Sequence, residues 1–124
     1  MIIDSDVIIE VLRGNTKTTA WLRKVRDSGS AIRYSPVTRA EIRAGARVRE
    51  RAAISALFES LAVLSIEAST GDLAGDQLSR FARSHSVQFG DALIAATALE
   101  LGEELATFNA KHFPGLKRIF APDR

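Results

Sequence analysis

The stretch MIIDSDVIIEVL, residues 1–12, decides the fold class. Its first three residues are an apolar run typical of a short buried strand, and that run ends at Asp4. Ser5 and Asp6 have the composition of a helix cap before a second apolar segment, residues 7–12, which stops at Gly14. A strand followed at once by a helix is the opening unit of an α/β protein.

The same alternation continues along the chain. Further strands are predicted at residues 31–35, 63–66, 105–107 and 118–120. Helices are predicted over residues 18–26, 37–47, 49–61, 69–85 and 91–101. The last helix is apolar nearly all round, which indicates burial. We therefore expect an α/β fold, with one domain over residues 1–124 and a central, mainly parallel β-sheet flanked by helices.

The composition is that of an ordinary globular protein. Among 124 residues there are 17 Lys and Arg, 15 Asp and Glu, a formal net charge of +2, and no cysteine. The lack of cysteine excludes disulfide scaffolds, thiol nucleophiles and cysteine-based zinc sites. No apolar run reaches the roughly 18 residues of a membrane span, so we expect a cytoplasmic protein with no membrane partner.

Asp4 is the first candidate for a functional acid. It follows a strand directly, and the crevice of an open α/β sheet lies at the carboxyl ends of its strands. Asp4 could instead cap the following helix, but Ser5 and Asp6 can perform that task. We therefore predict a functional role for Asp4 and mainly a capping role for Asp6.

Glu41 has two interpretations. The sequence from Thr38 to Glu41 has capping-box spacing, which by itself marks only a helix start. On a helix, however, Glu41 shares a face with Thr38 and with the small and apolar residues at positions 37, 44, 45 and 48. A carboxylate on such a face is expected to point inward, where it needs a cation or a hydrogen-bond donor.

Asp91 stands at the start of the nearly uncharged helix. Its simplest role is a favourable negative charge at a helix N-terminus, yet it is the third acid at the end of an element. Three carboxylates from separate elements, in a chain with only two histidines, suit Mg²⁺ or Mn²⁺ better than zinc. The rival acids Asp72 and Asp76 lie on an amphipathic helix and are predicted to be solvated surface.

Arg39, Arg43 and Arg47 follow one another at i, i+4 spacing on the other face of the helix that carries Glu41. Like charges at this spacing repel by a few tenths of a kcal/mol per pair. The stripe is therefore either a solvated face balanced by Glu50 or a contact surface for an anionic partner.

Four motifs in order resemble those of PIN-domain nucleases. They are MIIDSDVII (residues 1–9), SPVTRAEIRAG (35–45), GDALIAATAL (90–99) and LATFNAKHF (105–113). Their order, their spacing and the short chain resemble the VapC toxins of bacterial and archaeal toxin–antitoxin pairs. The resemblance implies a mixed α/β fold and Mg²⁺- or Mn²⁺-dependent endoribonuclease activity.

The resemblance also implies roles for individual residues. Asp4, Glu41 and Asp91 fall on the family's metal-binding acids, and Asn109 falls on a fourth catalytic position that is an aspartate in many PIN nucleases. Phe108 replaces an arginine that is common before that position. The supporting residues are then Ser5, Asp6 and Thr107.

The partners follow from the same resemblance. We expect an RNA substrate whose phosphates contact Arg39, Arg43 and Arg47, a homodimer, and a VapB-like antitoxin that covers the active groove.

Other interpretations stay open. A PIN nuclease could process cellular RNA without being a toxin. Residues 2–7 also resemble the nucleophile motif of haloacid-dehalogenase-like phosphatases, with Asp4 as nucleophile and Asp6 as acid/base, although the chain is short for that fold and a second aspartate after Asp91 is missing. A non-catalytic RNA- or protein-binding module, in which the acids serve only as caps, is the remaining alternative.

Overall fold

A five-stranded sheet forms the centre of the computed structural model, which describes residues 1–124. Its strands are β1 (Ile2–Ile3), β2 (Arg33–Tyr34), β3 (Ala62–Val63), β4 (Leu105–Ala106) and β5 (Ile119–Phe120). Their order across the sheet is β3-β2-β1-β4-β5, and every neighbouring pair is parallel. The α/β class and the parallel sheet expected from the sequence are confirmed.

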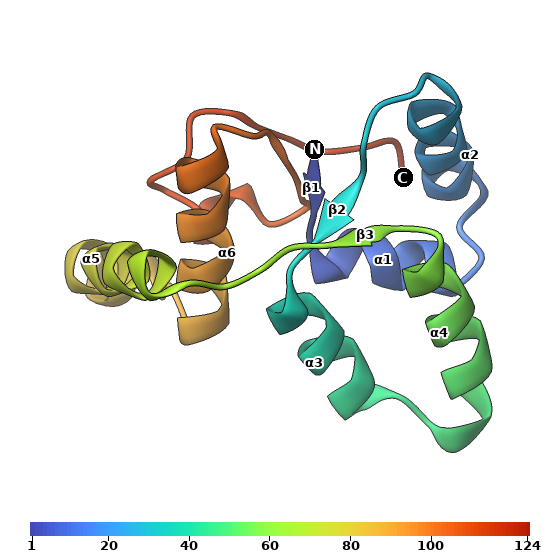
Figure 1. The fold of residues 1–124 in the computed structure, drawn as a ribbon, viewed down its shortest axis with the longest axis horizontal. Coiled ribbons are helices and arrows are strands. Elements are labelled where there is room, and N and C mark those ends of the chain that lie inside the picture. The colour runs from blue at the N-terminus through green and yellow to red at the C-terminus, as the bar shows by residue number, and fades with distance from the viewer.

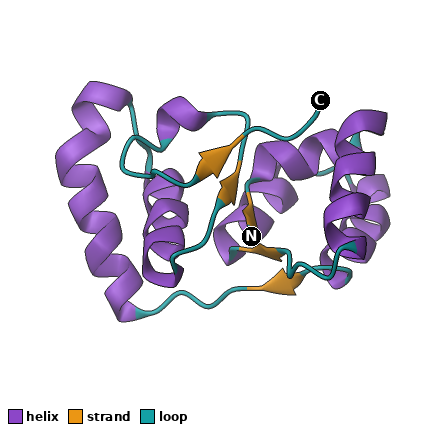
Figure 2. Cartoon of the chain, turned by 90° about the horizontal axis from the view of Figure 1, so that it is seen from above, coloured by secondary structure: helices purple, strands orange, loops and turns teal.

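Two layers of helices cover this sheet. The six α-helices are α1 (Ser5–Leu12), α2 (Thr16–Asp27), α3 (Pro36–Gly45), α4 (Arg51–Glu59), α5 (Ala68–His85) and α6 (Phe89–Leu101). Figures 1 and 2 show α1 to α4 on one side of the sheet and α5 with α6 on the other. Short 3₁₀ turns, η1 (Val48–Glu50) and η2 (Ala110–His112), complete the chain. No helix combines the length and the apolar character needed to cross a bilayer.

The strands are short, and the two central ones, β1 and β4, are buried on both faces. Successive strand residues point to opposite sides of a sheet. Ile3 accordingly packs in the core beneath α1 to α4 with Tyr34 and Phe58, whereas Ile2 packs with Ile94 of α6 and Leu105. Residues just beyond the strands are therefore held by two hydrophobic cores, and this gives the site below a rigid base.

Only Asp4 separates β1 from α1. The Asp4 carboxylate accepts a hydrogen bond from the Ser5 backbone N–H at 2.8 Å and caps α1. Ser5 and Asp6 lie inside the helix, so their predicted role as its cap is wrong. The chain leaves α1 at Gly14, whose φ of 82° suits glycine, and Asn15 caps α2.

The helix that carries Glu41 also differs from its predicted bounds. The Ser35 hydroxyl accepts a hydrogen bond from the Val37 N–H at 3.1 Å, and Pro36 occupies the first helical position. Ser followed by Pro is a strong helix start, and it sets the N-terminus three residues before the proposed capping box. The helix ends at Gly45, so Arg47 lies outside it.

Candidate active site

The strand order places one candidate site at the centre of the sheet. The chain runs from β1 to β2 and β3 on one side, whereas β4 and β5 lie on the other side. In an open parallel sheet, the crevice at such a switch point lies beyond the carboxyl ends of the two central strands. Asp4 directly follows β1 and Thr107 directly follows β4.

Thr107 connects the end of β4 to the start of α1. Its hydroxyl donates a hydrogen bond to Asp4 Oδ2 at 2.8 Å and lies 3.3 Å from Asp6 Oδ2. The backbone N–H of Phe108 also donates to Asp6 Oδ2, at 2.9 Å. Asp6 therefore links the first turn of α1 to the loop that follows β4. The two aspartates are held side by side by groups about one hundred residues away in the sequence.

Asp4 is only 6% exposed and lies among other carboxylates. Burial, then the charge of Asp6 and more weakly that of Glu41, raise the pKa of Asp4 to about 6, against the hydrogen bonds from Thr107 and Ser5. Burial also raises the pKa of Asp6, although the Phe108 N–H and Thr107 oppose that shift. No Lys or Arg forms an ion pair with either aspartate.

Glu41 lies at the rim of this crevice. Thr38 and Ile42 form the buried face of α3, whereas Glu41 and the residues at positions 44, 45 and 48 are exposed. The expectation that Glu41 points into the core is therefore wrong, because only the first turn of the face chosen from the sequence, at Val37 and Thr38, packs inward. Burial of its carboxyl group, followed by the charge of Asp91, still raises the pKa of Glu41, and the Ser5 hydroxyl opposes this shift.

Gly90 allows Glu41 and Asp91 to approach each other. A Cβ atom at position 90 would lie 3.2 Å from Val37 Cγ1 and 3.8 Å from the Glu41 carboxylate. Glycine thus lets the start of α6 pack closely against α3.

Asp91 stabilises the start of α6 and also contacts η2. Asp91 Oδ2 accepts a hydrogen bond from the Gln88 N–H at 3.2 Å and so stabilises the start of α6. The same oxygen lies 3.5 Å from His112 Nδ1 of η2. His112 had no role in the sequence analysis, because only the tertiary fold brings η2 to the start of α6.

The chemistry of this donor set fits a hard divalent cation. No three His, Asp or Glu side chains are drawn together as a tight metal cluster. Nevertheless, the pKa values of Asp4, Asp6 and Glu41 are all raised, and burial is the largest cause for each. For Asp4 and Glu41, repulsion from neighbouring carboxylates raises the pKa further. A divalent cation would relieve this repulsion, and carboxylate oxygens are the ligands that Mg²⁺ and Mn²⁺ prefer.

Two surface hollows beside α1 are lined by Glu41 and by Asp6, whereas Asp4 and Asp91 line neither of them. One, of about 210 Å³, lies between α1, α3 and α4 and is lined by Glu41. The other, also of about 210 Å³, is lined by Asp6, Asn109 and Arg124. Ile9 and Arg13 line both hollows, which therefore adjoin each other along α1. Asn109 lies in the hollow at Asp6, and its N–H donates to Thr107 Oγ1 at 3.0 Å.

The three arginines do not form one continuous stripe. Arg39 donates to the Tyr34 hydroxyl at 2.8 Å, and its guanidinium lies 5.1 Å from the centre of the Phe58 ring. Arg43 lines a small hollow between α3 and α4 with Arg39 and with Arg51, which the sequence analysis did not single out. Arg47 is exposed beyond the helix end.

A further arginine lies beside Phe108. The Arg124 guanidinium is 4.6 Å from the centre of the Phe108 ring and 3.7 Å from a Glu10 carboxylate oxygen. Local sequence cannot reveal this contact, because residues 108 and 124 come together only when β5 pairs with β4 in the sheet. A positive charge is thus present next to position 108 although that residue is phenylalanine.

Known proteins share this architecture over nearly the whole chain. The PIN domain family matches residues 1–118. Ribonuclease VapC10 of Mycobacterium tuberculosis is 37% identical over 123 residues, which cover 98% of this chain and 92% of that protein. Ribonuclease VapC19 of the same species is 32% identical over 114 residues, 91% of each chain. DNA-bound VapBC from Salmonella typhimurium superposes with a TM-score of 0.81 at 22% identity, covering 97% of this chain and 96% of that chain.

Proposed function

This chain belongs to the PIN-domain family as a ribonuclease of the VapC toxin type, and we propose that its active site is built from Asp4, Glu41 and Asp91. One observation carries the proposal. Asp4 is buried at the central switch point of the sheet, next to Asp6 and Glu41, with no basic side chain paired to it. A fold does not retain such repulsion for stability, and it therefore indicates a functional site. The family assignment also favours a nuclease over the phosphatase interpretation.

PIN-domain ribonucleases are typically metal-dependent, and we propose that Asp4, Glu41 and Asp91 hold Mg²⁺ or Mn²⁺. When bound, such an ion lowers the pKa of water and neutralises charge that develops on a phosphate. Asn109, in the hollow beside Asp6, adds an amide oxygen at the fourth catalytic position. Amide oxygen keeps a ligand there but contributes no negative charge.

The surrounding residues hold the acids in place. The Thr107 hydroxyl and the Ser5 N–H each bind one oxygen of the Asp4 carboxylate, which fixes its plane. Asp6 is held by the Phe108 N–H and keeps a second negative charge beside Asp4. His112 is a positioning residue for Asp91, from a distance of 3.5 Å. Orientation of reacting groups by such contacts contributes strongly to catalysis.

Two protein partners complete the proposal. A structurally similar chain was solved in a toxin–antitoxin complex from Klebsiella pneumoniae, with a TM-score of 0.78. We propose that this chain forms a homodimer and is neutralised by a VapB-like antitoxin. Copurification of the chain with the product of a neighbouring gene, and loss of RNA cleavage in that complex, would test the second partner.

Cleavage of RNA is expected to require a divalent metal. Purified chain should convert a pool of total tRNA and rRNA into discrete fragments with Mg²⁺ or Mn²⁺, and EDTA should stop this conversion, because the acids cannot bind a phosphate without a cation between them. Gel electrophoresis of the products gives the result. Fragments that persist in EDTA would contradict the metal-dependent mechanism, and no fragments in any metal from folded, antitoxin-free chain would contradict the nuclease assignment.

Loss of two arginines is expected to flatten the salt dependence of RNA binding. Each phosphate contact to single-stranded RNA contributes a slope of about −0.7 to the plot of log affinity against log salt concentration. Changing Arg43→Gln together with Arg47→Gln should therefore make the slope shallower by about 1.4. Arg39 stays unchanged, because its contacts with Tyr34 and Phe58 also stabilise the fold.

The matched control removes two exposed arginines from α5, on the opposite side of the sheet, as Arg80→Gln with Arg83→Gln. Fluorescence anisotropy of a labelled RNA, repeated at several salt concentrations, measures both slopes. An identical slope for the wild type and the Arg43/Arg47 variant would mean that these arginines are ordinary solvated surface.

A further inference from the structure

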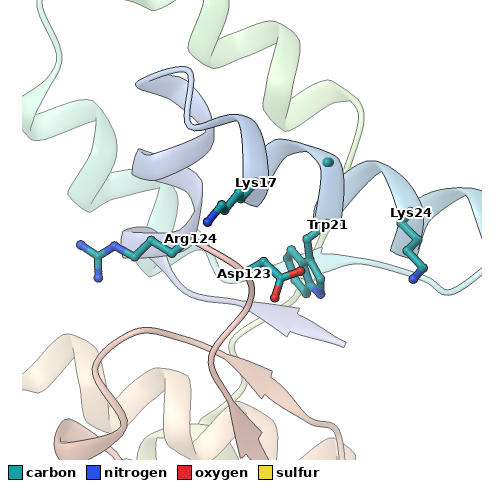
Figure 3. A pocket seen from close by; sticks show the side chains of 6 residues that line it. Lys17, Trp21, Lys24, Asp123 and Arg124 are labelled. Atoms are coloured by element: carbon teal, nitrogen blue, oxygen red, sulfur yellow. The ribbon is translucent and has the colours of Figure 1, made fainter.

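A larger hollow lies between α2 and the C-terminal tail. Its volume is about 570 Å³, and its lining is Lys17, Ala20, Trp21, Lys24, Asp123 and Arg124. Figure 3 shows Lys17, Trp21 and Lys24 along one face of α2, with the tail residue Asp123 beside Trp21 and the Arg124 side chain extending away from it. We call this hollow the Trp21 cavity.

The walls of the Trp21 cavity are fixed by the fold. The Thr18 hydroxyl, which is fully buried, donates a hydrogen bond to the Asp123 carbonyl oxygen at 2.8 Å. The Trp21 ring lies 5.6 Å from the Phe120 ring, centre to centre, and is only partly buried. The tail is therefore anchored against α2, and part of the Trp21 ring stays accessible.

The two lysines of the cavity are not needed for packing. Lys17 and Lys24 are exposed and belong to none of the ion pairs in the structure. They lie on the same helical face as Trp21, one on each side of it, about 10 Å apart along the helix. With Arg124 and the single acid Asp123, the four charged side chains of the lining sum to +2.

The Trp21 cavity adjoins one hollow of the candidate active site at Arg124. Arg124 lines this cavity and also the hollow that holds Asp6 and Asn109. The Arg124 guanidinium lies over the ring of Phe108, the residue whose backbone N–H binds Asp6. The Trp21 cavity, the hollow at Asp6 and the hollow at Glu41 are therefore neighbours along this side of the chain.

We propose that the Trp21 cavity binds single-stranded RNA on one side of the cleavage site, with a base stacked on Trp21 and phosphates against Lys17, Lys24 and Arg124. An aromatic face between separated cations matches the alternation of base and phosphate in a single strand. An acidic peptide would match the cations but would leave the ring without a partner. The proposal rests on the ribonuclease function above and assigns to it a subsite outside the catalytic acids.

Trp21 itself provides the measurement, because it is the only tryptophan in the chain. The protein in EDTA is titrated with a decamer of uridylate, a trimer of uridylate and a decamer of glutamate while Trp21 fluorescence is recorded. The RNA decamer should quench the fluorescence, the trimer should bind more weakly, and the glutamate decamer should have little effect.

The variant Lys17→Gln with Lys24→Gln should weaken decamer binding by about 10-fold at low salt and make the salt slope shallower by about 1.4. Arg23→Gln with Arg26→Gln removes the same charge from α2 outside the cavity and should change neither quantity. Trp21→Leu keeps an apolar contact for Phe120 and should weaken binding about 10-fold, as measured by anisotropy of labelled decamer, because the stacking face is lost.

Cleavage assays with Mg²⁺ separate this proposal from the one on which it rests. If the wild type cleaves RNA, the Lys17/Lys24 variant should show a raised KM and an unchanged kcat. If that variant binds the decamer with the affinity and salt slope of the wild type, and cleaves RNA with the same KM, the proposed subsite is overturned. The ribonuclease function would be unaffected by that result. Equal quenching by the glutamate decamer would also overturn it, in favour of a site for an acidic peptide. Failure of the wild type to cleave would instead overturn the function itself.

Discussion

Asp4→Asn is expected to lower the kcat for RNA cleavage by at least about 1,000-fold. Removing the charge of a central metal ligand forfeits several kcal/mol of transition-state stabilisation, and each 1.4 kcal/mol changes the rate tenfold. The fold should persist, because the Asn oxygen can accept from the Ser5 N–H. The Asn amide can then donate to Thr107, whose hydroxyl is free to turn toward Asp6. Quantified cleavage of the RNA identified in the pool experiment gives the rate.

Asp76→Asn is the matched control for this substitution. Asp76 is exposed on α5 and forms no ion pair, as the sequence predicted for it. The same chemical change should therefore leave cleavage unaltered there. Full activity of the Asp4 variant would show that the buried carboxylate is not part of the active site.

The same Asp4→Asn substitution is expected to stabilise the chain without metal by about 3 kcal/mol above pH 6. The folded state raises the pKa of Asp4 from 3.8 to about 6, so folding favours the protonated form. The contribution of the Asp4 carboxyl group to the free energy of unfolding is complete below pH 3.8 and is lost as the pH rises through about 6. The loss is about 1.4 kcal/mol for each unit by which the folded pKa exceeds the unfolded one. Asparagine does not ionise and avoids this loss.

Urea unfolding of both proteins in EDTA, at several pH values between 4 and 8, tests this expectation. The difference in unfolding free energy should grow from near zero at pH 4 and level off above pH 6 to 7. Asp76→Asn, at an exposed carboxylate, is measured beside it as the control. A variant that is less stable than the wild type at every pH would mean that the hydrogen bonds of Asp4 outweigh its electrostatic cost.

The position of each principal acid could be predicted from local sequence, whereas its surroundings could not. Asp4 ends an apolar run, and Asp91 stands in the first turn of a helix that is apolar all round; both features are visible without a structure. The inward orientation expected for Glu41 is wrong, because the packing of α3 selects Thr38 and Ile42 as its buried face. Helical periodicity defines candidate faces, but the sheet and neighbouring helices choose among them.

The sequence by itself determined the elements of this protein, their order and therefore its α/β class, because apolar periodicity, caps and turn residues act over a few neighbouring positions. Only the tertiary structure decided which groups share a site. The Thr107 hydroxyl reaches Asp4 across 103 residues, His112 lies at Asp91, and Arg124 lies over Phe108. These contacts depend on β4 entering the sheet beside β1 and on β5 pairing with β4, and such long-range strand pairing is decided by the burial of the whole core.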